Sequence, residues 1–258
     1  MAKIATLPGV RSPGRAVVFA TCYGNRNHPG LVEDLVAVLE HNGVGTALVG
    51  KERCCGMPKL ELGDLESVEK LKDVNIPLLA PLARAGFAIL TPVPSCTLMF
   101  KQELPLLFPE DEDVQAVADA MFDPFEYFVL RDRDGLLRKD FTQPLGAVSY
   151  HIPCHSRVQN VGQKTRESLE WVPDTKVNTV ERCAGPDGTW GVKSEFFATS
   201  MKIGKPVFNR MADPAPDYIS SDCPIAGRRI EQGMDEAGNA RVRKEHPLTL
   251  LRIAYGLD

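Results

Sequence analysis

The sequence predicts an α/β fold of two similar halves, each a small parallel β-sheet flanked by helices, with cysteines at the carboxyl-terminal ends of the strands. Three observations carry this prediction. Short apolar runs alternate with amphipathic helical segments, a cysteine follows each of six such runs, and the order of the first half recurs in the second. Strands that alternate with helices form parallel sheets.

Each of the three apolar runs in the first half is followed by cysteine. The runs and their cysteines are 16–21 before Cys22, 45–50 before Cys54 and Cys55, and 87–93 before Cys96. Between these runs, apolar side chains recur at helical spacing over residues 31–39, and Gly43 suits the end of that helix. Asp64 is expected to cap a second helix, and Pro77 to begin another helical turn that ends at Gly86.

The second half repeats the order of strand, cysteine and helix. Its runs and cysteines are 146–153 before Cys154, 176–181 before Cys183, and 217–222 before Cys223. Helices are predicted over residues 161–171, 194–203, 225–234 and 246–257. The shared order indicates an internal duplication.

A polar stretch between the two halves suggests where the domains begin and end. Residues 1–14 are predicted to be an N-terminal arm, 15–130 the first domain, 131–145 a polar linker, and 146–258 the second domain.

The net charge of −4 argues against nucleic-acid binding. No apolar run approaches the roughly 20 residues that span a bilayer, and no signal-peptide pattern is present, so a cytoplasmic location is expected.

The seven cysteines carry most of the functional information. An odd number without a secretion signal argues against a disulfide framework. Because the carboxyl ends of parallel strands share one edge of a sheet, cysteines distant in sequence converge there. Thiolates are soft ligands that select iron–sulfur clusters, zinc or Cu(I), and Gly56 and Gly185 let backbone N–H groups approach a bulky inorganic core. The predicted metal ligands are Cys22, Cys54, Cys55, Cys96, Cys154, Cys183 and Cys223.

These motifs resemble those of the CCG cysteine-rich domain. Cys22 is followed, after 31 residues, by Cys-Cys-Gly and then by PSC. The matching segments are CCGMPKLELGD, PSCTLMFKQELP, YHIPCHSRVQNVG, ERCAGPDGTWGVK and SDCPIAGRRIEQG, which extend the resemblance from about residue 15 to the C-terminus. The domain occurs in heterodisulfide reductases, in glycolate- and lactate-oxidase iron–sulfur subunits, and in the iron–sulfur subunit of anaerobic glycerol-3-phosphate dehydrogenase, which this sequence resembles in particular.

The resemblance implies paired α/β domains that bind [4Fe–4S]-type clusters and transfer electrons, with disulfide cleavage in the heterodisulfide reductases. A complete motif has five cysteines per half. Here Met99 stands at the last position of the first half, and Ala184 and Ala226 replace two cysteines of the second. Four thiolates suffice for an ordinary [4Fe–4S] cluster or a zinc ion. Three leave one coordination position open, or filled by another side chain.

Several polar side chains near the strand ends are secondary candidates. His155 is either an additional ligand or proton donor, or a hydrogen-bonded structural histidine, whereas His151 lies within a strand run and is expected to be structural. Lys101, Arg157 and Lys193 either form a cationic environment for a negatively charged cluster or are solvated surface charges.

The leading prediction is an iron–sulfur oxidoreductase subunit that relays electrons through one [4Fe–4S] cluster in the first half, with a second iron–sulfur or zinc site in the other. It would accept electrons from a flavoprotein dehydrogenase or reduce a disulfide. No ferredoxin-like C-x2-C-x2-C-x3-C-P run precedes residue 15. A ferredoxin-like or flavoprotein electron-transfer subunit is therefore the expected partner, through which the chain could associate peripherally with a membrane.

Two alternatives stay open. The first is a zinc-binding regulatory or scaffold module without turnover, because zinc accepts three or four thiolates. The second is a metal-free thiol enzyme with Cys55 as its nucleophile, which would leave the other six cysteines unexplained.

Overall fold

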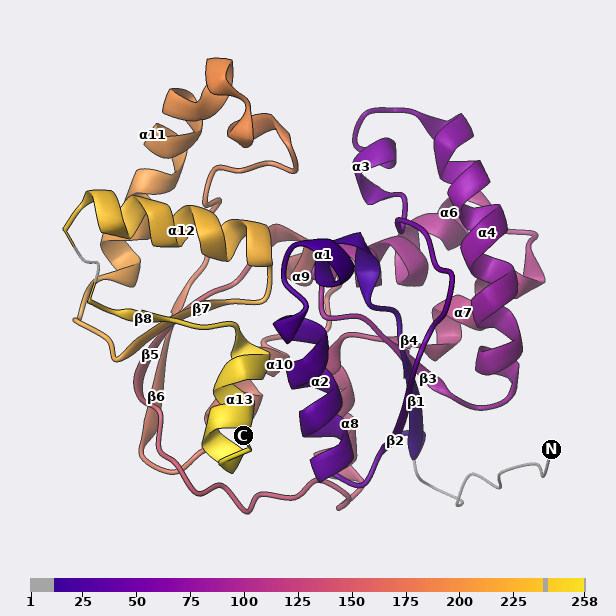
Figure 1. The fold of residues 1–258 in the computed structure, drawn as a ribbon, viewed down its shortest axis with the longest axis horizontal. Coiled ribbons are helices and arrows are strands. Elements are labelled where there is room, and N and C mark those ends of the chain that lie inside the picture. Colours follow the sequence, from indigo (N-terminus) through magenta and orange to yellow (C-terminus); the bar gives the residue numbers. More distant parts are fainter. Residues whose placement is uncertain (1–11, 239–240, 258) are drawn as a thin grey trace. The chain divides into compact units, whose positions relative to one another are not determined.

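The computed structural model describes residues 12–238 and 241–257. The chain divides into two compact units, Met1–Arg138 and Lys139–Asp258 (Figure 1). The division falls inside residues 131–145, for which a linker is predicted, although the helix α8 extends to Arg133 within that segment. The limits of the domains themselves stay a prediction.

The first unit contains a parallel four-stranded sheet in the order β2-β1-β3-β4. Its strands are β1 (Arg15–Val18), β2 (Gly45–Leu48), β3 (Ala88–Leu90) and β4 (Met121–Phe122). Three of them confirm predicted strands. The two-residue β4 was not predicted, because a strand this short has no recognisable alternation of apolar and polar residues.

Helices cover both faces of this sheet, with α2 on one side and α4 and α7 on the other (Figure 1). The helical elements are α1 (Thr21–Arg26), α2 (Gly30–His41), α3 (Met57–Leu60), α4 (Leu65–Arg84), α5 (Pro94–Leu98), the π-helix η1 (Met99–Glu103), α6 (Leu104–Leu107), α7 (Glu112–Ala120) and α8 (Pro124–Arg133). Val17 and Ile89 of the sheet belong to one buried cluster with Leu79 of α4 and Val117 of α7. This core fixes the strand ends from which the cysteines follow.

Helix α4 is continuous where the sequence predicts a break. Asp64 caps it as predicted, since its carboxylate accepts a hydrogen bond of 3.1 Å from the Ser67 amide. Pro77 lies inside the helix instead of beginning a new one. A proline removes one helical hydrogen bond, but burial of Ile76 and Leu79 against the sheet holds the helix together across it.

The second unit repeats this topology, with a parallel sheet in the order β6-β5-β7-β8. Its strands are β5 (Gly146–His151), β6 (Thr175–Val180), β7 (Tyr218–Ser221) and β8 (Arg243–Lys244). The helical elements are α9 (Cys154–Arg157), α10 (Lys164–Leu169), the 3-10 helix η2 (Trp190–Val192), α11 (Ser194–Met211), α12 (Pro224–Glu236) and α13 (Pro247–Tyr255). The predicted α/β fold of two similar halves is therefore confirmed.

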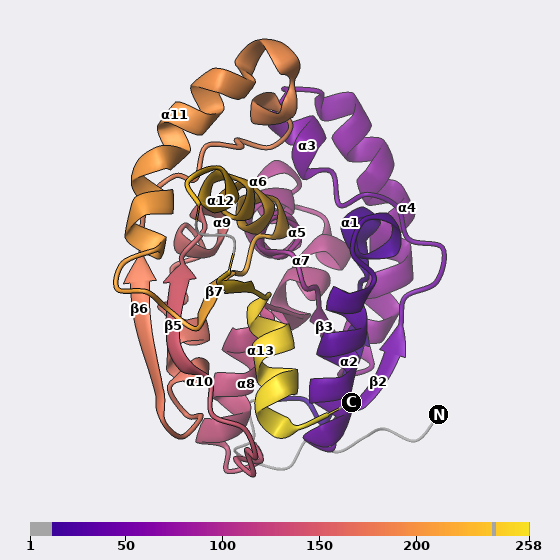
Figure 2. The same ribbon diagram turned by 60° about the vertical axis from the view of Figure 1, so that its left-hand side comes forward.

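Two helical layers enclose the second sheet (Figure 2). Ile219 of β7 packs in a buried cluster with Phe208 of α11 and Ile230 of α12, while α10 and α13 contact one another. Helix α11 continues to Met211, beyond the predicted end at residue 203, because its apolar face stays buried after Pro206. Within the described ranges, no helix has the length and apolar character needed to cross a membrane.

Candidate metal centre

The cysteines of the first unit follow the strand ends directly. Cys22 is the second residue of α1, immediately after Thr21, whose φ of 69° turns the chain sharply. The Thr21 hydroxyl accepts a hydrogen bond of 3.1 Å from the Gly24 amide, which stabilises this turn. Cys96 lies in α5, whose first residue is Pro94. Local turns at the sheet edge therefore bring these thiols to the same edge.

The four thiols of the first unit form a continuous array. Cys54 makes side-chain hydrogen bonds with Cys22 and Cys55, and Cys55 makes one with Cys96. The thiol hydrogen bonds from Cys22 and Cys55 hold the pKa of Cys54 well below its usual value, with further help from the Gly56 amide. The same contacts raise the pKa values of Cys22 and Cys55. The array thus favours one thiolate at its centre.

Exposure changes along this array. Cys55 and Cys96 are buried, Cys54 is half-buried and Cys22 is exposed. Buried Cys55 with a raised pKa does not suit the role of an exposed, low-pKa nucleophile that the thiol-enzyme alternative requires. Met99 is fully buried in the same apolar cluster as Cys55 and Cys96.

Each unit has a glycine amide directed at a cysteine sulfur. Gly56 has φ 103° and its amide hydrogen bonds to Cys54. Gly185 has φ 100° and its amide donates to the Cys183 sulfur over 3.4 Å. Both positions need the backbone freedom of glycine. At Gly185 an added Cβ would also lie 2.3 Å from the backbone oxygen of Ser200.

The three thiols of the second unit are more exposed and less tightly connected. Cys154 and Cys183 are exposed, and Cys223 precedes α12 as its N-cap residue. Burial and then the charge of Cys183 raise the pKa of Cys154. Burial is the main cause that raises the pKa of Cys223 to about 11, and the charges of Cys154 and Asp222 add to it. The structure therefore brings these three thiols within electrostatic range of one another.

A Glu-Arg-Cys segment occurs once in each unit, and its glutamate contacts the helix that contains the first cysteine of that unit. In the first unit, the side-chain amide of Asn25 donates a hydrogen bond of 2.8 Å to Glu52. At the equivalent place in the second unit, Arg157 forms an ion pair of 3.2 Å with Glu181. These contacts were not predicted, although the segments KERCCG and VERCAG contain the repeated Glu-Arg-Cys pattern that indicates them.

The three predicted cationic side chains have different surroundings. Arg157 acts on the Cys154 thiol by its charge. Lys101 instead forms an ion pair with Glu126 and lies 5.7 Å from the centre of the Phe122 ring. Lys193 is the N-cap residue of α11 and is exposed. Lys59, for which no role was predicted, lowers the pKa of Cys54 in the first unit.

The two histidines of the second unit have different surroundings. His151 is buried, its Nε2 donates to the Arg182 carbonyl over 2.8 Å, and its Nδ1 lies 3.0 Å from the Ser221 hydroxyl. Burial lowers the pKa of His151 to about 4, so the ring is neutral and structural, as expected. His155 contacts Cys154 through its backbone amide. Its imidazole as a ligand stays a prediction.

The donor set can be tested against the metals it could hold. Within residues 12–238 and 241–257, no three His, Cys, Asp or Glu side chains converge on a single point as one metal ion requires. An iron–sulfur cluster binds its thiolates at separate iron atoms, so its ligands need not converge in that way. An array of four thiols with a backbone amide on the central sulfur is a donor set that a cluster could use.

Helix α12 also secures the Cys183 segment. Arg229 of α12 is buried, its guanidinium donates a hydrogen bond of 2.7 Å to the Gly191 carbonyl, and it lies 4.7 Å from the centre of the Phe197 ring. The Ser200 hydroxyl donates to the Gly185 carbonyl over 2.9 Å. The helix that begins after Cys223 is thus tied to the turn that follows Cys183.

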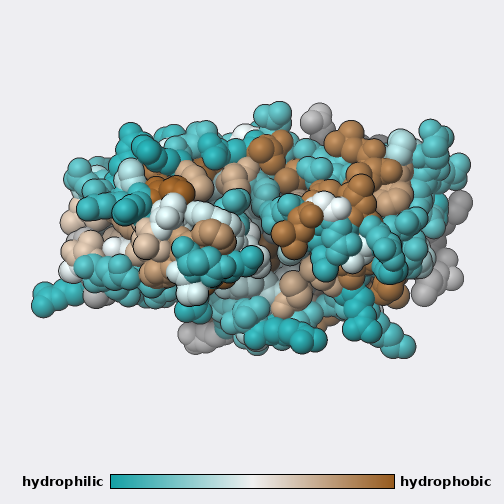
Figure 3. Space-filling view, turned by 90° about the horizontal axis from the view of Figure 1, so that it is seen from above, coloured by the Kyte–Doolittle hydropathy of each residue, from teal (hydrophilic) through white to brown (hydrophobic). Residues whose placement is uncertain are grey.

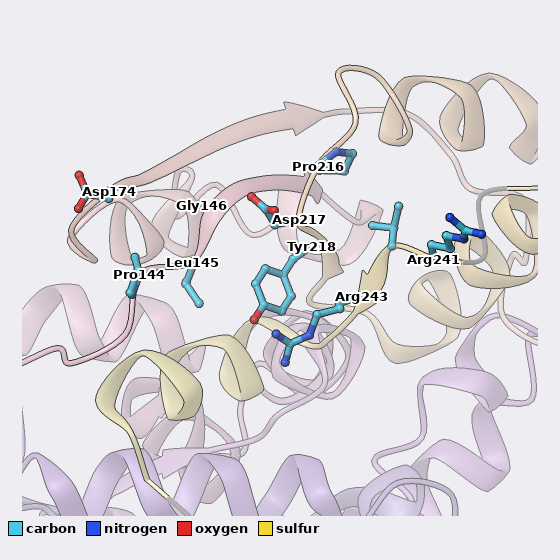
Figure 4. A pocket seen from close by; sticks show the side chains of 10 residues that line it. Pro144, Leu145, Gly146, Asp174, Pro216, Asp217, Tyr218, Arg241 and Arg243 are labelled. Carbon is cyan, nitrogen blue, oxygen red and sulfur yellow. The ribbon is translucent and has the colours of Figure 1, made fainter.

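A cavity of about 730 Å³ lies at the other edge of the second sheet. It is lined by the first residues of β5, β7 and β8, which are Gly146, Tyr218 and Arg243 (Figure 4). Arg243 stacks 4.5 Å from the centre of the Tyr218 ring, and Asp217 accepts a hydrogen bond of 2.8 Å from the Ala147 amide. These are the amino ends of the strands, so this cavity is separate from the thiols.

Comparison with known proteins follows the same division into two halves. The sequence profile of the CCG cysteine-rich domain matches residues 16–101 and again 148–225. The chain belongs to the CCG family. Its two matches each contain one of the cysteine sets described above, so the family's domain occurs twice in this chain.

Relatives of this CCG protein include subunits of redox enzymes. One component of anaerobic glycerol-3-phosphate dehydrogenase from Escherichia coli (strain K12) is 29% identical over 238 residues, which are 92% of this chain and 58% of the relative. One component of dihydromethanophenazine:CoB–CoM heterodisulfide reductase from Methanosarcina acetivorans is 25% identical over 97% of this chain and 62% of the relative. An iron–sulfur protein of Methanocaldococcus jannaschii is 25% identical over 85% and 42%. The chain thus spans about half of these relatives' length.

Proposed function

We propose that this chain is an iron–sulfur subunit of an oxidoreductase, with one [4Fe–4S] cluster held by Cys22, Cys54, Cys55 and Cys96. The contact of all four thiols in one array is the observation that carries this proposal. The names of the glycerol-3-phosphate dehydrogenase and heterodisulfide reductase relatives support an electron-transfer role. When bound, the cluster supplies one-electron transfer.

The chain's own residues would prepare this site for a negatively charged cluster. The Gly56 amide and the Lys59 charge already stabilise a thiolate at Cys54. Cys55 and Cys96 lie in the apolar core, which excludes water from one side of the array. Cys22 faces solvent, so electrons would enter or leave on its side.

The second site would be the less complete one, with three thiolates from Cys154, Cys183 and Cys223. Its exposure leaves room for a small thiol or disulfide, or for His155 as a fourth ligand. An electron-transfer subunit of the ferredoxin or flavoprotein kind is the proposed partner. Exposed apolar side chains are available for such contacts, among them Leu62 with 74% and Val192 with 60% of its surface exposed. Figure 3 shows such apolar areas among hydrophilic ones.

Anaerobic reconstitution tests the first site. We expect iron and sulfide in the purified chain, a visible charge-transfer absorption, and an EPR signal after reduction. Cys96→Ser should remove the signal of the first site, while Thr97→Ser, at the neighbouring buried position, should keep it. A colourless chain without iron would contradict the proposal. Stoichiometric zinc without visible absorption would contradict it as well and would support the zinc module instead.

A further inference from the structure

A cavity of about 420 Å³ lies against the exposed side of the thiol array in the first unit. The end of α1 and the segment before Cys54 form its walls. Its lining residues are Cys22, Asn25, Arg26, Glu52, Arg53 and Cys54. The two buried thiols of the array do not line it, so the cavity lies on the solvent side of the proposed cluster.

The cavity has an excess of positive charge. Arg26 and Arg53 are both exposed, and across the described part of the chain neither guanidinium has an ion pair or a hydrogen bond. The carboxylate of Glu52 accepts the hydrogen bond from Asn25, which joins the two walls at 2.8 Å. Two cations therefore face one engaged carboxylate, in a chain whose net charge is −4.

The equivalent place in the second unit does not offer these cations. There Arg157 is used in the ion pair with Glu181. Val158, with 54% of its surface exposed, stands where the first unit has Arg26. Only Arg182 corresponds to Arg53. The same scaffold thus carries two unpaired arginines beside the thiols in one half only, which indicates a role specific to that half.

We propose that this cavity binds a small oxyanion, a carboxylate or a phosphate group, beside Cys22 and Cys54. Guanidinium groups bind both oxyanions through two parallel hydrogen bonds. The inference rests on the proposed function, because a cluster held by four thiolates carries negative charge and would repel an anion unless nearby cations offset that charge. Arg26 and Arg53 supply this offset. The site would hold an anionic substrate against the exposed edge of the redox centre.

The test is anion binding to the reconstituted chain under anaerobic conditions. Inorganic phosphate and acetate are titrated separately at constant ionic strength with chloride, and binding is measured by calorimetry and by the shift of the EPR signal. We expect saturable binding of at least one anion. The anion that binds with the higher affinity identifies the class of oxyanion. Arg26→Gln and Arg53→Gln should each weaken it about tenfold or more.

Arg182→Gln is the matched control, since it removes the corresponding arginine of the second unit and should leave binding unchanged. No saturable binding of either anion, or equal affinity in the parent chain and the Arg26 and Arg53 variants, would overturn the inference. Iron and sulfide content is measured first. A chain that takes up no iron speaks against the proposed function, and the same titration on the metal-free chain then decides the fate of the oxyanion site alone.

Discussion

The two cysteine sites have the same scaffold but differ in completeness and in exposure. Where the first unit has Cys55, the second has Ala184, and where the first has Met99, the second has Ala226. All four side chains are buried, with exposed fractions of 4%, 2%, 0% and 5%. A small apolar side chain, Ala184, can therefore stand in the second unit where the first has the buried Cys55 thiol without loss of the fold, so this buried position gives the first unit one more thiol than the second.

The largest expected difference concerns the two glycines that approach sulfur. Gly185→Ala forces a left-handed backbone on alanine and places its Cβ against the rigid backbone oxygen of Ser200, so we expect a loss of about 3 kcal/mol or more in the free energy of unfolding. Gly56→Ala has the same backbone strain, but the nearest atom to its Cβ is the flexible end of Met99 at 3.3 Å, so about 1–2 kcal/mol is expected. Urea unfolding of both variants measures these losses. Equal losses would show that the backbone around Gly185 is not packed more tightly than the backbone around Gly56.

The second prediction tests the tie between α12 and the Cys183 segment. Arg229→Ala leaves the Gly191 carbonyl without its donor and removes the stacked guanidinium from Phe197, which should cost about 2 kcal/mol. Arg228→Ala is the control, because that side chain is largely exposed and should change stability by less than about 0.5 kcal/mol. Thermal unfolding compares the two. If both variants unfold at the same temperature as the parent chain, α12 does not stabilise the Cys183 segment.

A third prediction separates the thiols of the reduced, metal-free chain by their reactivity. Hydrogen bonds keep Cys54 as a thiolate at neutral pH, whereas the raised pKa of Cys223, about 11, keeps that thiol protonated until the pH approaches this value. Iodoacetamide followed by mass spectrometry should therefore modify Cys54 about tenfold or more faster than Cys223 at pH 7. The ratio should fall as the pH rises, and a ratio that stays constant with pH would refute the assignment.

The smallest effect is expected from the contacts of the repeated Glu-Arg-Cys segments. Glu181→Gln removes a surface ion pair whose partners are 36% and 56% exposed, so we expect less than about 1 kcal/mol, diminishing further in high salt. Glu52→Gln keeps an acceptor for Asn25 and breaks no ion pair, so a smaller loss and a weaker salt dependence are expected. Unfolding in low and high salt distinguishes them. The same salt dependence in both variants would show that the two contacts are alike.

Much of the fold was predictable because the strands are short apolar runs separated by helices. The strands before all six cysteine positions are confirmed within a few residues, as is the Asp64 cap. The misses have physical causes. Strands β4 and β8 contain two residues each. The sequence predicts a helix start at Pro77 because the local pattern does not contain the tertiary burial that keeps α4 continuous there.

By itself, the sequence determined which residues lie at the carboxyl ends of the parallel strands, because strand periodicity and chain order fix that edge. Only the tertiary structure decided that the pKa of Cys54 is the lowered one, that Lys59 contributes to this while Lys101 pairs with Glu126, and that Arg26 and Arg53 share a cavity beside Cys54. Those properties depend on burial and on distances between segments far apart in the chain. Neither is encoded in the local pattern of residues.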